Sequence, residues 1–274
     1  MSLYKPVTVL TGASSGIGAA LARVFAEHGH ELALVARREA QLAALADEIA
    51  AGNRKRPVVL AIDLARSDAP ARISHELISR GLEPAIVVNN AGFGLAGAAV
   101  TLDRAEQLAM IDLNVRTLTD MSLRWVESLA RHRGGILNVA SVAGFFSGPN
   151  MAVYYGTKAY VLSFSEALHV ELKPRGIRVT ALAPGPVPTE FQARAGVGRL
   201  PPVLTCTAEQ VARQGYAGLM RGRRLVVPGL ANKFATLLPR FLPRAVMLRL
   251  VRASQPGRAK AQEGWPRRRP EASG

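Results

Sequence analysis

The residues YYGTK, from Tyr154 to Lys158, place two phenols close to an ammonium group. The chain has only 5 tyrosines in 274 residues, so this pair stands out from the background. A phenol with a pKa of about 10 exchanges protons poorly at neutral pH, but a nearby ammonium group stabilises its phenolate. Either tyrosine could therefore act as an acid, or both could be packing aromatics. The choice depends on whether the rest of the chain builds a site around them.

A glycine-rich stretch, TGASSGIG at residues 11–18, follows the first apolar run of the chain. Gly12 permits a tight turn, Gly16 lets the backbone approach a phosphate, and Gly18 allows close helix packing. Amide groups at the start of a helix would then receive the pyrophosphate of a dinucleotide. The spacing is GxxxGxG rather than GxGxxG, so the position between the first strand and the first helix carries the prediction of nucleotide binding.

The second apolar run ends in LVARRE, which places Arg37 and Arg38 where an acidic residue would bind the ribose of NAD. Guanidinium groups suit a 2′-phosphate and can stack on adenine. Two arginines after a strand can also be ordinary solvated charges. Together with the glycine turn, they favour NADP (NADPH) over NAD as the cofactor.

Short apolar runs alternate with longer helical patterns, as expected for strands of a parallel sheet covered on both faces. We predict a doubly wound α/β fold of the Rossmann type, with about seven strands and helices on both faces, as one domain over residues 1–228. The predicted helices include residues 18–29, 39–50 and 152–176. The predicted strands are residues 7–10, 31–36, 58–63, 85–88, 136–141, 178–183 and 224–228.

The pattern changes beyond Pro228. Residues 229–255 predict a helical extension, divided into two short helices by Pro239 and Pro243. The second is imperfectly amphipathic, with Arg244, Arg249 and Arg252 on one side. The extension could dock on the domain or on another subunit, or it could contact a membrane surface. We expect residues 256–274, which are basic, to be disordered.

The formal charge of +15 invites a nucleic-acid-binding function. Much of the excess lies beyond Gly222 without a recognised nucleic-acid motif, so we expect no such partner. The single cysteine, Cys206, excludes an intramolecular disulfide and fits a reducing compartment. The start of the chain leaves no room for a signal peptide, and no apolar run of about 18 residues occurs. We expect a cytoplasmic protein, at most peripheral at a membrane, with no metal site.

These features occur together with further motifs in an order that resembles the short-chain dehydrogenase/reductase family over residues 5–228. The motifs are TGASSGIG, Asp63–Leu64, NNAG at 89–92, Asn114 in DLNV, Ser141 in NVASVAG, YYGTK, and PGPVPT at 184–189. The family motif YxxxK fits only Tyr154 with Lys158. Four residues along a helix return to the same face, so both side chains can enter one cleft. Tyr155 pairs with Ala159 and is turned away.

The resemblance implies an oxidoreductase that transfers hydride between nicotinamide and a carbonyl or secondary alcohol. Tyr154 would be the general acid, with its pKa lowered by Lys158, which would also hold the nicotinamide ribose. Ser141 would donate a hydrogen bond to the reacting oxygen, and Asn114 would hold a water behind the lysine. Apolar side chains near these residues suggest an apolar substrate pocket, or could be buried beneath it: Val142, Phe145, Phe146, Met151 and Val153. Residues 192–207 could form a mobile cover over an apolar substrate or an ordinary surface loop. A sensor or scaffold that has lost turnover is the alternative.

The resemblance also implies cofactor contacts. Asp63 should meet the adenine amino group, and Val187 with Thr189 should meet the nicotinamide amide. Some NADP-using relatives carry a basic residue at the position of Ser15, so the cofactor choice depends on the two arginines. The full predicted set is Gly12, Ser14, Ser15, Gly16, Ile17, Gly18, Arg37, Arg38, Asp63, Leu64, Asn90, Ala91, Gly92, Tyr154, Lys158, Pro184, Gly185, Val187 and Thr189.

The helix that carries Tyr154 continues through AYVLSFSEALHVEL with apolar residues on more than one side. Helices of this kind pair across subunits in the family, so the resemblance implies a homodimer or a homotetramer.

Overall fold

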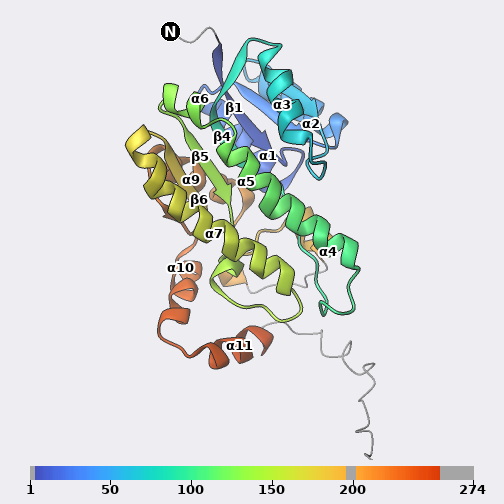
Figure 1. Ribbon diagram of the computed structural model, residues 1–274, viewed down its shortest axis with the longest axis vertical. Coiled ribbons are helices and arrows are strands. Elements are labelled where there is room, and N and C mark those ends of the chain that lie inside the picture. The colour runs from blue at the N-terminus through green and yellow to red at the C-terminus, as the bar shows by residue number, and fades with distance from the viewer. Residues whose placement is uncertain (1–3, 196–201, 254–274) are drawn as a thin grey trace, which may run out of the picture.

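The computed structural model describes residues 4–195 and 202–253. The prediction for residues 256–274 lies outside this range, as does part of the predicted cover at 192–207. All seven predicted runs form strands of one parallel sheet in the order β3-β2-β1-β4-β5-β6-β7, of which Figure 1 labels β1, β4, β5 and β6. The strands are β1 Lys5–Thr11, β2 Leu32–Ala36, β3 Val58–Ala61, β4 Leu82–Asn89, β5 Gly135–Val139, β6 Arg178–Leu182 and β7 Leu225–Val226. The doubly wound α/β fold is therefore confirmed.

Helices link the strands and cover the sheet. They are α1 Gly16–Glu27, α2 Glu39–Ala51, α3 Ala69–Ile78, α4 Arg104–Ile111, α5 Leu118–Leu123, α6 Val126–Arg131, α7 Ala152–Leu172, α8 Glu190–Ala195, α9 Ala208–Met220, α10 Leu230–Leu237 and α11 Arg244–Ala253. A π-helical turn, Asp112–Thr117, joins α4 to α5, and short 3-10 turns include η2 Val142–Phe145, η4 Pro202–Leu204 and η5 Leu238–Arg240.

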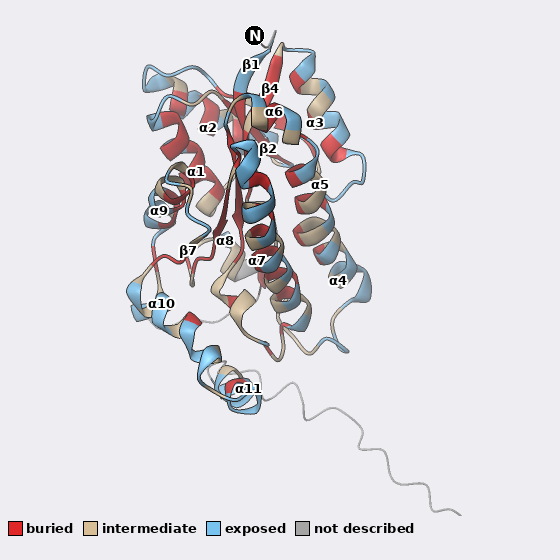
Figure 2. Cartoon of the chain, turned by 60° about the vertical axis from the view of Figure 1, so that its left-hand side comes forward, coloured by how far each residue is buried: buried red, intermediate tan, exposed pale blue. Residues whose placement is uncertain are grey.

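The sheet is buried on both faces, which explains the continuous apolar runs. Successive side chains of a strand point to opposite faces. In β1, Leu10 joins a core with side chains of α1, α2 and α9, whereas Val9 joins one with side chains of α3, α5 and α7. Figure 2 shows these two helical layers on either side of the sheet.

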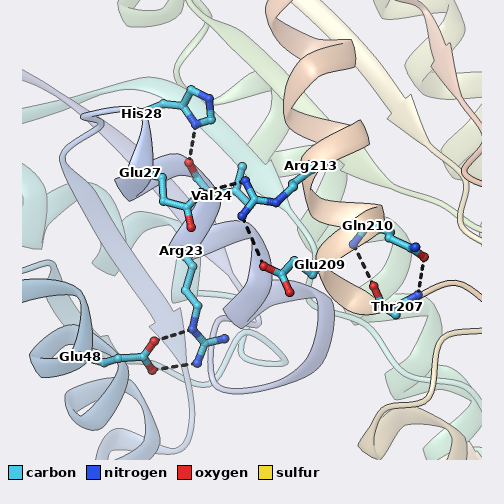
Figure 3. Close-up of polar contacts among 9 residues, drawn as sticks. All are labelled: Arg23, Val24, Glu27, His28, Glu48, Thr207, Glu209, Gln210 and Arg213. Atoms are coloured by element: carbon cyan, nitrogen blue, oxygen red, sulfur yellow. Dashed lines mark hydrogen bonds and ion pairs between the residues drawn. The ribbon is translucent and has the colours of Figure 1, made fainter. Parts of the chain in front are cut away.

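Polar contacts at the surface link the helices of the layer formed by α1, α2 and α9, here called the first layer. Arg23 of α1 makes a two-point ion pair with Glu48 of α2, at 2.7 and 2.9 Å, and Arg213 of α9 reaches Glu27 of α1 at 2.9 Å (Figure 3). These pairs are partly exposed, so each contributes at most about 1 kcal/mol. The layer is held mainly by the apolar core beneath them, where Phe25 meets Tyr216 edge to face at 4.9 Å.

The last two helices, α10 and α11, project from the end of the molecule at which the strands finish (Figure 1). As the two prolines predict, they are separate short helices. Within the described residues, no helix is long and apolar enough to cross a bilayer.

Candidate active site

The site begins where β1 and β4, neighbours in the sheet, end side by side. Strand order reverses between these strands, which is where ligands bind in open α/β sheets. The Thr11 hydroxyl accepts the backbone N–H groups of Asn90 and Ala91 at 3.0 and 3.1 Å and donates to the Val88 carbonyl at 3.1 Å. The side-chain amide of Asn90 in turn donates to the carbonyls of Thr11 and Gly12. These bonds fix the loops after both strands against each other.

The glycine turn leaves a close backbone approach at the start of α1. Gly12 and Gly16 adopt φ of 66° and 55°, which favours glycine. A Cβ on Gly18 would lie 2.1 Å from the Gly12 carbonyl oxygen, so no larger residue fits without movement. The turn therefore suits a dinucleotide pyrophosphate at the N-terminus of α1.

Arg38 lies over this turn. Its guanidinium donates to the Ser14 hydroxyl at 3.2 and 3.1 Å and to the Ser15 hydroxyl at 2.9 Å. It also pairs with the Glu190 carboxylate, at the start of α8, at 2.9 Å. The hydrogen bond from Arg38 lowers the pKa of the Glu190 carboxyl. Arg37 is exposed to solvent, so the two arginines occupy different environments.

The predicted catalytic side chains converge from β5 and α7. Ser141 follows β5 and caps η2, where its hydroxyl accepts the Ala143 N–H at 3.1 Å. Tyr154 and Lys158 lie one turn apart on α7 and are both buried, and Ser141 is close enough to act on the pKa of the Tyr154 phenol. The Lys158 ammonium donates to the Val139 carbonyl at 2.9 Å, which ties α7 to the end of β5.

The electrostatics differ from the expectation that Lys158 lowers the pKa of Tyr154. Burial raises the pKa of Tyr154 to about 12, and the hydrogen bond to Ser141 opposes this rise only in part. Burial also lowers the pKa of Lys158 to about 8. The Lys158 nitrogen lies 5.9 Å from the centre of the Tyr154 ring, so desolvation outweighs their attraction. At neutral pH Tyr154 holds its proton, which is the form that can donate to a carbonyl oxygen.

Asn114 lies in the π-helical turn and bridges three segments. Its side-chain amide donates to the Phe93 carbonyl at 2.9 Å and to the Thr157 hydroxyl at 3.1 Å, and its oxygen accepts the Phe93 N–H at 3.1 Å. Thr157 in turn donates to the Tyr154 carbonyl at 2.7 Å. Sequence reasoning missed Thr157, although it lies inside the YYGTK motif.

An apolar cluster surrounds Tyr154. It includes Met151 and Val153, as predicted, with Met110, Leu95 and Phe191. Tyr155 meets Tyr154 edge to face, with ring centres 6.1 Å apart, and its ring packs against Gly148 and the same apolar cluster, so it is a packing residue beside Tyr154. The predicted pocket residues Val142 and Phe145 instead pack against a cluster formed by residues of α7, β6 and the segment after β7. For these two residues the structure agrees with the alternative of burial beneath the pocket, because η2 turns both side chains toward the core.

The remaining predicted residues line the same edge of the sheet. Asp63 follows β3 and accepts the Ala65 N–H at 3.1 Å, while Leu64 beside it is buried. A Cβ on Gly92 would lie 2.8 Å from the Asn114 oxygen and 3.6 Å from the Lys158 nitrogen, so this glycine faces the catalytic group. The loop after β6 supplies the other side. Its members are Pro184, whose carbonyl accepts the Val142 N–H, Gly185 against Asn232, the buried Val187, and Thr189 against Gly16.

Comparisons with known proteins agree with this geometry. A family model described as short chain dehydrogenase matches residues 6–198. Sulfoacetaldehyde reductase 2 of Chromohalobacter salexigens is 37% identical over 188 residues, which cover 68% of this chain and 74% of that protein.

Two solved structures share the fold. A short-chain dehydrogenase from Sphingobium yanoikuyae in complex with NADPH matches with a TM-score of 0.76 and 32% identity, covering 88% of this chain and 98% of that chain. The 3-ketoacyl-(acyl-carrier-protein) reductase from Brucella melitensis complexed with NADH matches with a TM-score of 0.73 and 26% identity, covering 84% and 98%. The chain belongs to the short-chain dehydrogenase family and is a dehydrogenase or reductase acting on a CH–OH or C=O group.

Proposed function

We propose that the protein is an NADP-dependent oxidoreductase that interconverts a carbonyl and a secondary alcohol on an apolar substrate, with Tyr154 as the general acid or base. The observation that carries this proposal is the buried Tyr154, one turn from Lys158, with Ser141 acting to lower the pKa of its phenol and with the glycine turn at the same edge of the sheet. The nicotinamide, when bound, supplies or accepts the hydride.

Different side chains donate the proton, stabilise the reacting oxygen and position the donor. In reduction, Tyr154 donates its phenolic proton to the carbonyl oxygen as negative charge develops there. Ser141 donates a hydrogen bond to the same oxygen. Asn114 and Thr157 hold the first turn of α7 against the π-helical turn, which keeps Tyr154 in place.

The cluster around Tyr154 supports an apolar substrate. Met151, Leu95 and Phe191 lie beside the phenol, so a substrate carbonyl near Tyr154 would have apolar neighbours. Excluding water from this region strengthens the hydrogen bonds made to the reacting oxygen.

Arg38 supports NADP as the cofactor. A 2′-phosphate beyond the glycine turn could accept charge-assisted hydrogen bonds from its guanidinium, which already reaches Ser14 and Ser15. The Sphingobium relative was solved with NADPH, but the Brucella reductase was solved with NADH. The choice between the cofactors therefore depends on this chain's own residues.

The test is a panel of ketones, aldehydes and alcohols followed by nicotinamide absorbance, with two tyrosine variants. Tyr154→Phe should abolish turnover and leave NADPH binding largely intact, because only the transferable proton is removed. Tyr155→Phe is the matched control and should retain most activity. The reverse order would show that the wrong tyrosine is assigned. NADPH binding without turnover on the whole panel would favour a catalytically silent sensor or scaffold.

We also propose a homodimer or homotetramer assembled through α7. Its surface leaves Val170 68% exposed and Tyr160 38% exposed. Leu123 on the neighbouring α5 is 47% exposed. Sedimentation velocity at micromolar concentration measures the assembly, and a monomer alone would contradict the proposal.

A further inference from the structure

The helix α10 has its apolar side turned to solvent. Leu230, Phe234 and Leu237 follow an i, i+4, i+7 spacing and therefore lie along one side, with Leu230 73% and Phe234 70% exposed. The opposite side carries Asn232 and Thr236, which are buried. A surface helix normally buries its apolar side and exposes its polar one. The arrangement in α10 is the reverse.

Polar anchoring explains how α10 can hold this orientation. The Asn232 amide donates to the carbonyls of Pro228 at 2.9 Å and Leu204 at 3.1 Å, and its side chain fills the space beside Gly185. Thr236 donates to the Lys233 carbonyl at 2.8 Å. Asn232 thus fixes the polar side of α10 to the body, and among the described residues the apolar side has no core to pack against.

The exposed apolar side continues beyond α10. Phe241, after η5, is 78% exposed, and only Met247 is buried in α11. Figure 2 shows α10 and α11 as mainly exposed helices at the end of the molecule. We name the following residues the α10–α11 surface: Leu230, Lys233, Phe234, Leu237, Leu238, Arg240, Phe241, Arg244, Val246, Leu248, Arg249 and Leu250.

The charge of this segment has one sign. Residues 229–253 contain Lys233, Arg240, Arg244, Arg249 and Arg252 and no aspartate or glutamate. Two copies paired through this surface would bring like charges together, so a second copy of the chain is a poor partner. The phosphate contacts of a nucleic-acid duplex need cations but not exposed phenylalanines. An anionic lipid surface offers negatively charged headgroups to the cations and an apolar interior to the exposed apolar side chains.

We propose that the α10–α11 surface binds to anionic phospholipid bilayers, with Leu230, Phe234, Leu237 and Phe241 in the interface and the basic side chains among the headgroups. This docking is peripheral and does not depend on the catalytic assignment.

The surface lies next to the candidate active site. α10 contacts both η2, which Ser141 caps, and η4, and its Asn232 packs against Gly185 in the loop after β6. Membrane docking would therefore bring the site close to the lipid. If the proposed function holds, an apolar substrate dissolved in the bilayer could enter the site without crossing bulk water.

The test is flotation of the full chain with vesicles of phosphatidylcholine alone or of phosphatidylcholine mixed with phosphatidylserine. Wild-type protein should bind the mixed vesicles and be released by high salt. Phe234→Ser/Phe241→Ser should weaken binding by roughly tenfold or more, because two large apolar side chains no longer enter the interface. Arg240→Gln/Arg244→Gln should weaken it by on the order of tenfold on mixed vesicles only.

Matched controls lie on the far side of the molecule. Ile78→Ser removes a side chain that is 56% exposed at the end of α3, and Arg54→Gln/Arg72→Gln removes two exposed charges. Both should bind vesicles like the wild type. Thermal stabilisation by NADPH in every variant would show that the fold is intact.

Three results would overturn the proposal. One is wild-type protein that stays unbound to mixed vesicles at low salt. Another is binding to duplex DNA that depends on Arg240 and Arg244 but not on the phenylalanines, which would indicate a nucleic-acid partner. The third is a smaller assembly for the phenylalanine variant together with unchanged vesicle binding, which would indicate a subunit interface. Failure of turnover would contradict the proposed function and leave vesicle binding unaffected.

Discussion

Replacing Arg38 by alanine should weaken NADPH binding selectively. The guanidinium lies over the glycine turn and already donates to Ser14 and Ser15. A hydrogen bond to a charged group contributes roughly 1.5–3 kcal/mol, so loss of one such bond to a 2′-phosphate should raise the Kd for NADPH about 10- to 150-fold. The Kd for NADH, which has no 2′-phosphate, should change little.

Two neighbouring variants sharpen this expectation. Arg37 is exposed, so Arg37→Ala should raise the Kd for NADPH by no more than about fivefold, as for a screened surface charge. Glu190 pairs with Arg38 at 2.9 Å and would compete with a phosphate for the same guanidinium. Glu190→Gln should therefore tighten NADPH binding by up to about fivefold, because the pair is solvent-exposed.

The assay is a paired titration of NADPH and NADH by nicotinamide fluorescence, which needs no substrate. It compares wild type with Arg38→Ala, Arg37→Ala and Glu190→Gln. The reasoning fails if the wild type prefers NADH. It also fails if Arg38→Ala weakens the binding of NADPH and NADH equally. The arginine would then stabilise the glycine turn without contacting the 2′-phosphate.

The pKa of about 8 for buried Lys158, instead of 10.5, places roughly 3 kcal/mol of unfavourable free energy on its charged form. Lys158→Met should therefore be inactive but more stable than wild type at pH 7, by up to that amount in denaturant titrations. The unfolded chain keeps the Lys158 proton up to a higher pH than the folded chain does. The free energy of unfolding of the wild type should therefore rise relative to that of the variant between about pH 8 and 10.5. A constant difference between the two would contradict the burial argument. The rate of carbonyl reduction should fall above about pH 8 as Lys158 loses its charge, whereas Tyr154, with a pKa of about 12, stays protonated; a flat rate to pH 10 would show that the lysine charge is dispensable. Gly18→Ala should abolish NADPH binding, since its Cβ would lie 2.1 Å from a carbonyl oxygen, whereas Gly156→Ala in α7 meets open space and should stabilise the fold by about 0.5–1 kcal/mol, as thermal unfolding and cofactor titration can show.

The strands could be predicted because burial on both faces leaves a continuous apolar run. Their ends could not, because long-range partners decide them. β4 begins at Leu82, although Glu83 and Pro84 are poor strand residues. The Glu83 carboxylate is buried, and His132 and Arg131 pair with it at 2.7 and 2.5 Å. No local pattern shows these partners.

The candidate site likewise has features that the sequence predicts and features that depend on long-range contacts. The YxxxK spacing places Tyr154 and Lys158 on one face of a helix, so their proximity follows from helix geometry alone. Glu190 reaches Arg38 only because the loop after β6 returns over the glycine turn, so no spacing along the chain could reveal that pair. The reversed orientation of α10 was hidden for a similar reason. The Asn232 amide donates to the carbonyl of Leu204 in η4, 28 residues earlier in the chain, and no local pattern shows that acceptor.

The π-helical turn at Asp112–Thr117 has a consequence for the geometry of the whole α4–α5 rod. A π turn holds one more residue than an α turn, which shifts the helical phase by about 100°. Helix α4 therefore presents one side to the start of α7, while α5, continuous with it, presents a different side to β4. A chain one residue shorter at this turn would restore an uninterrupted α-helix. It would then have to rotate either Met110 or Met121, both fully buried, out of its core. The extra residue thus lets α4 pack against α7 while α5 packs against β4, an arrangement that a regular helix could not provide.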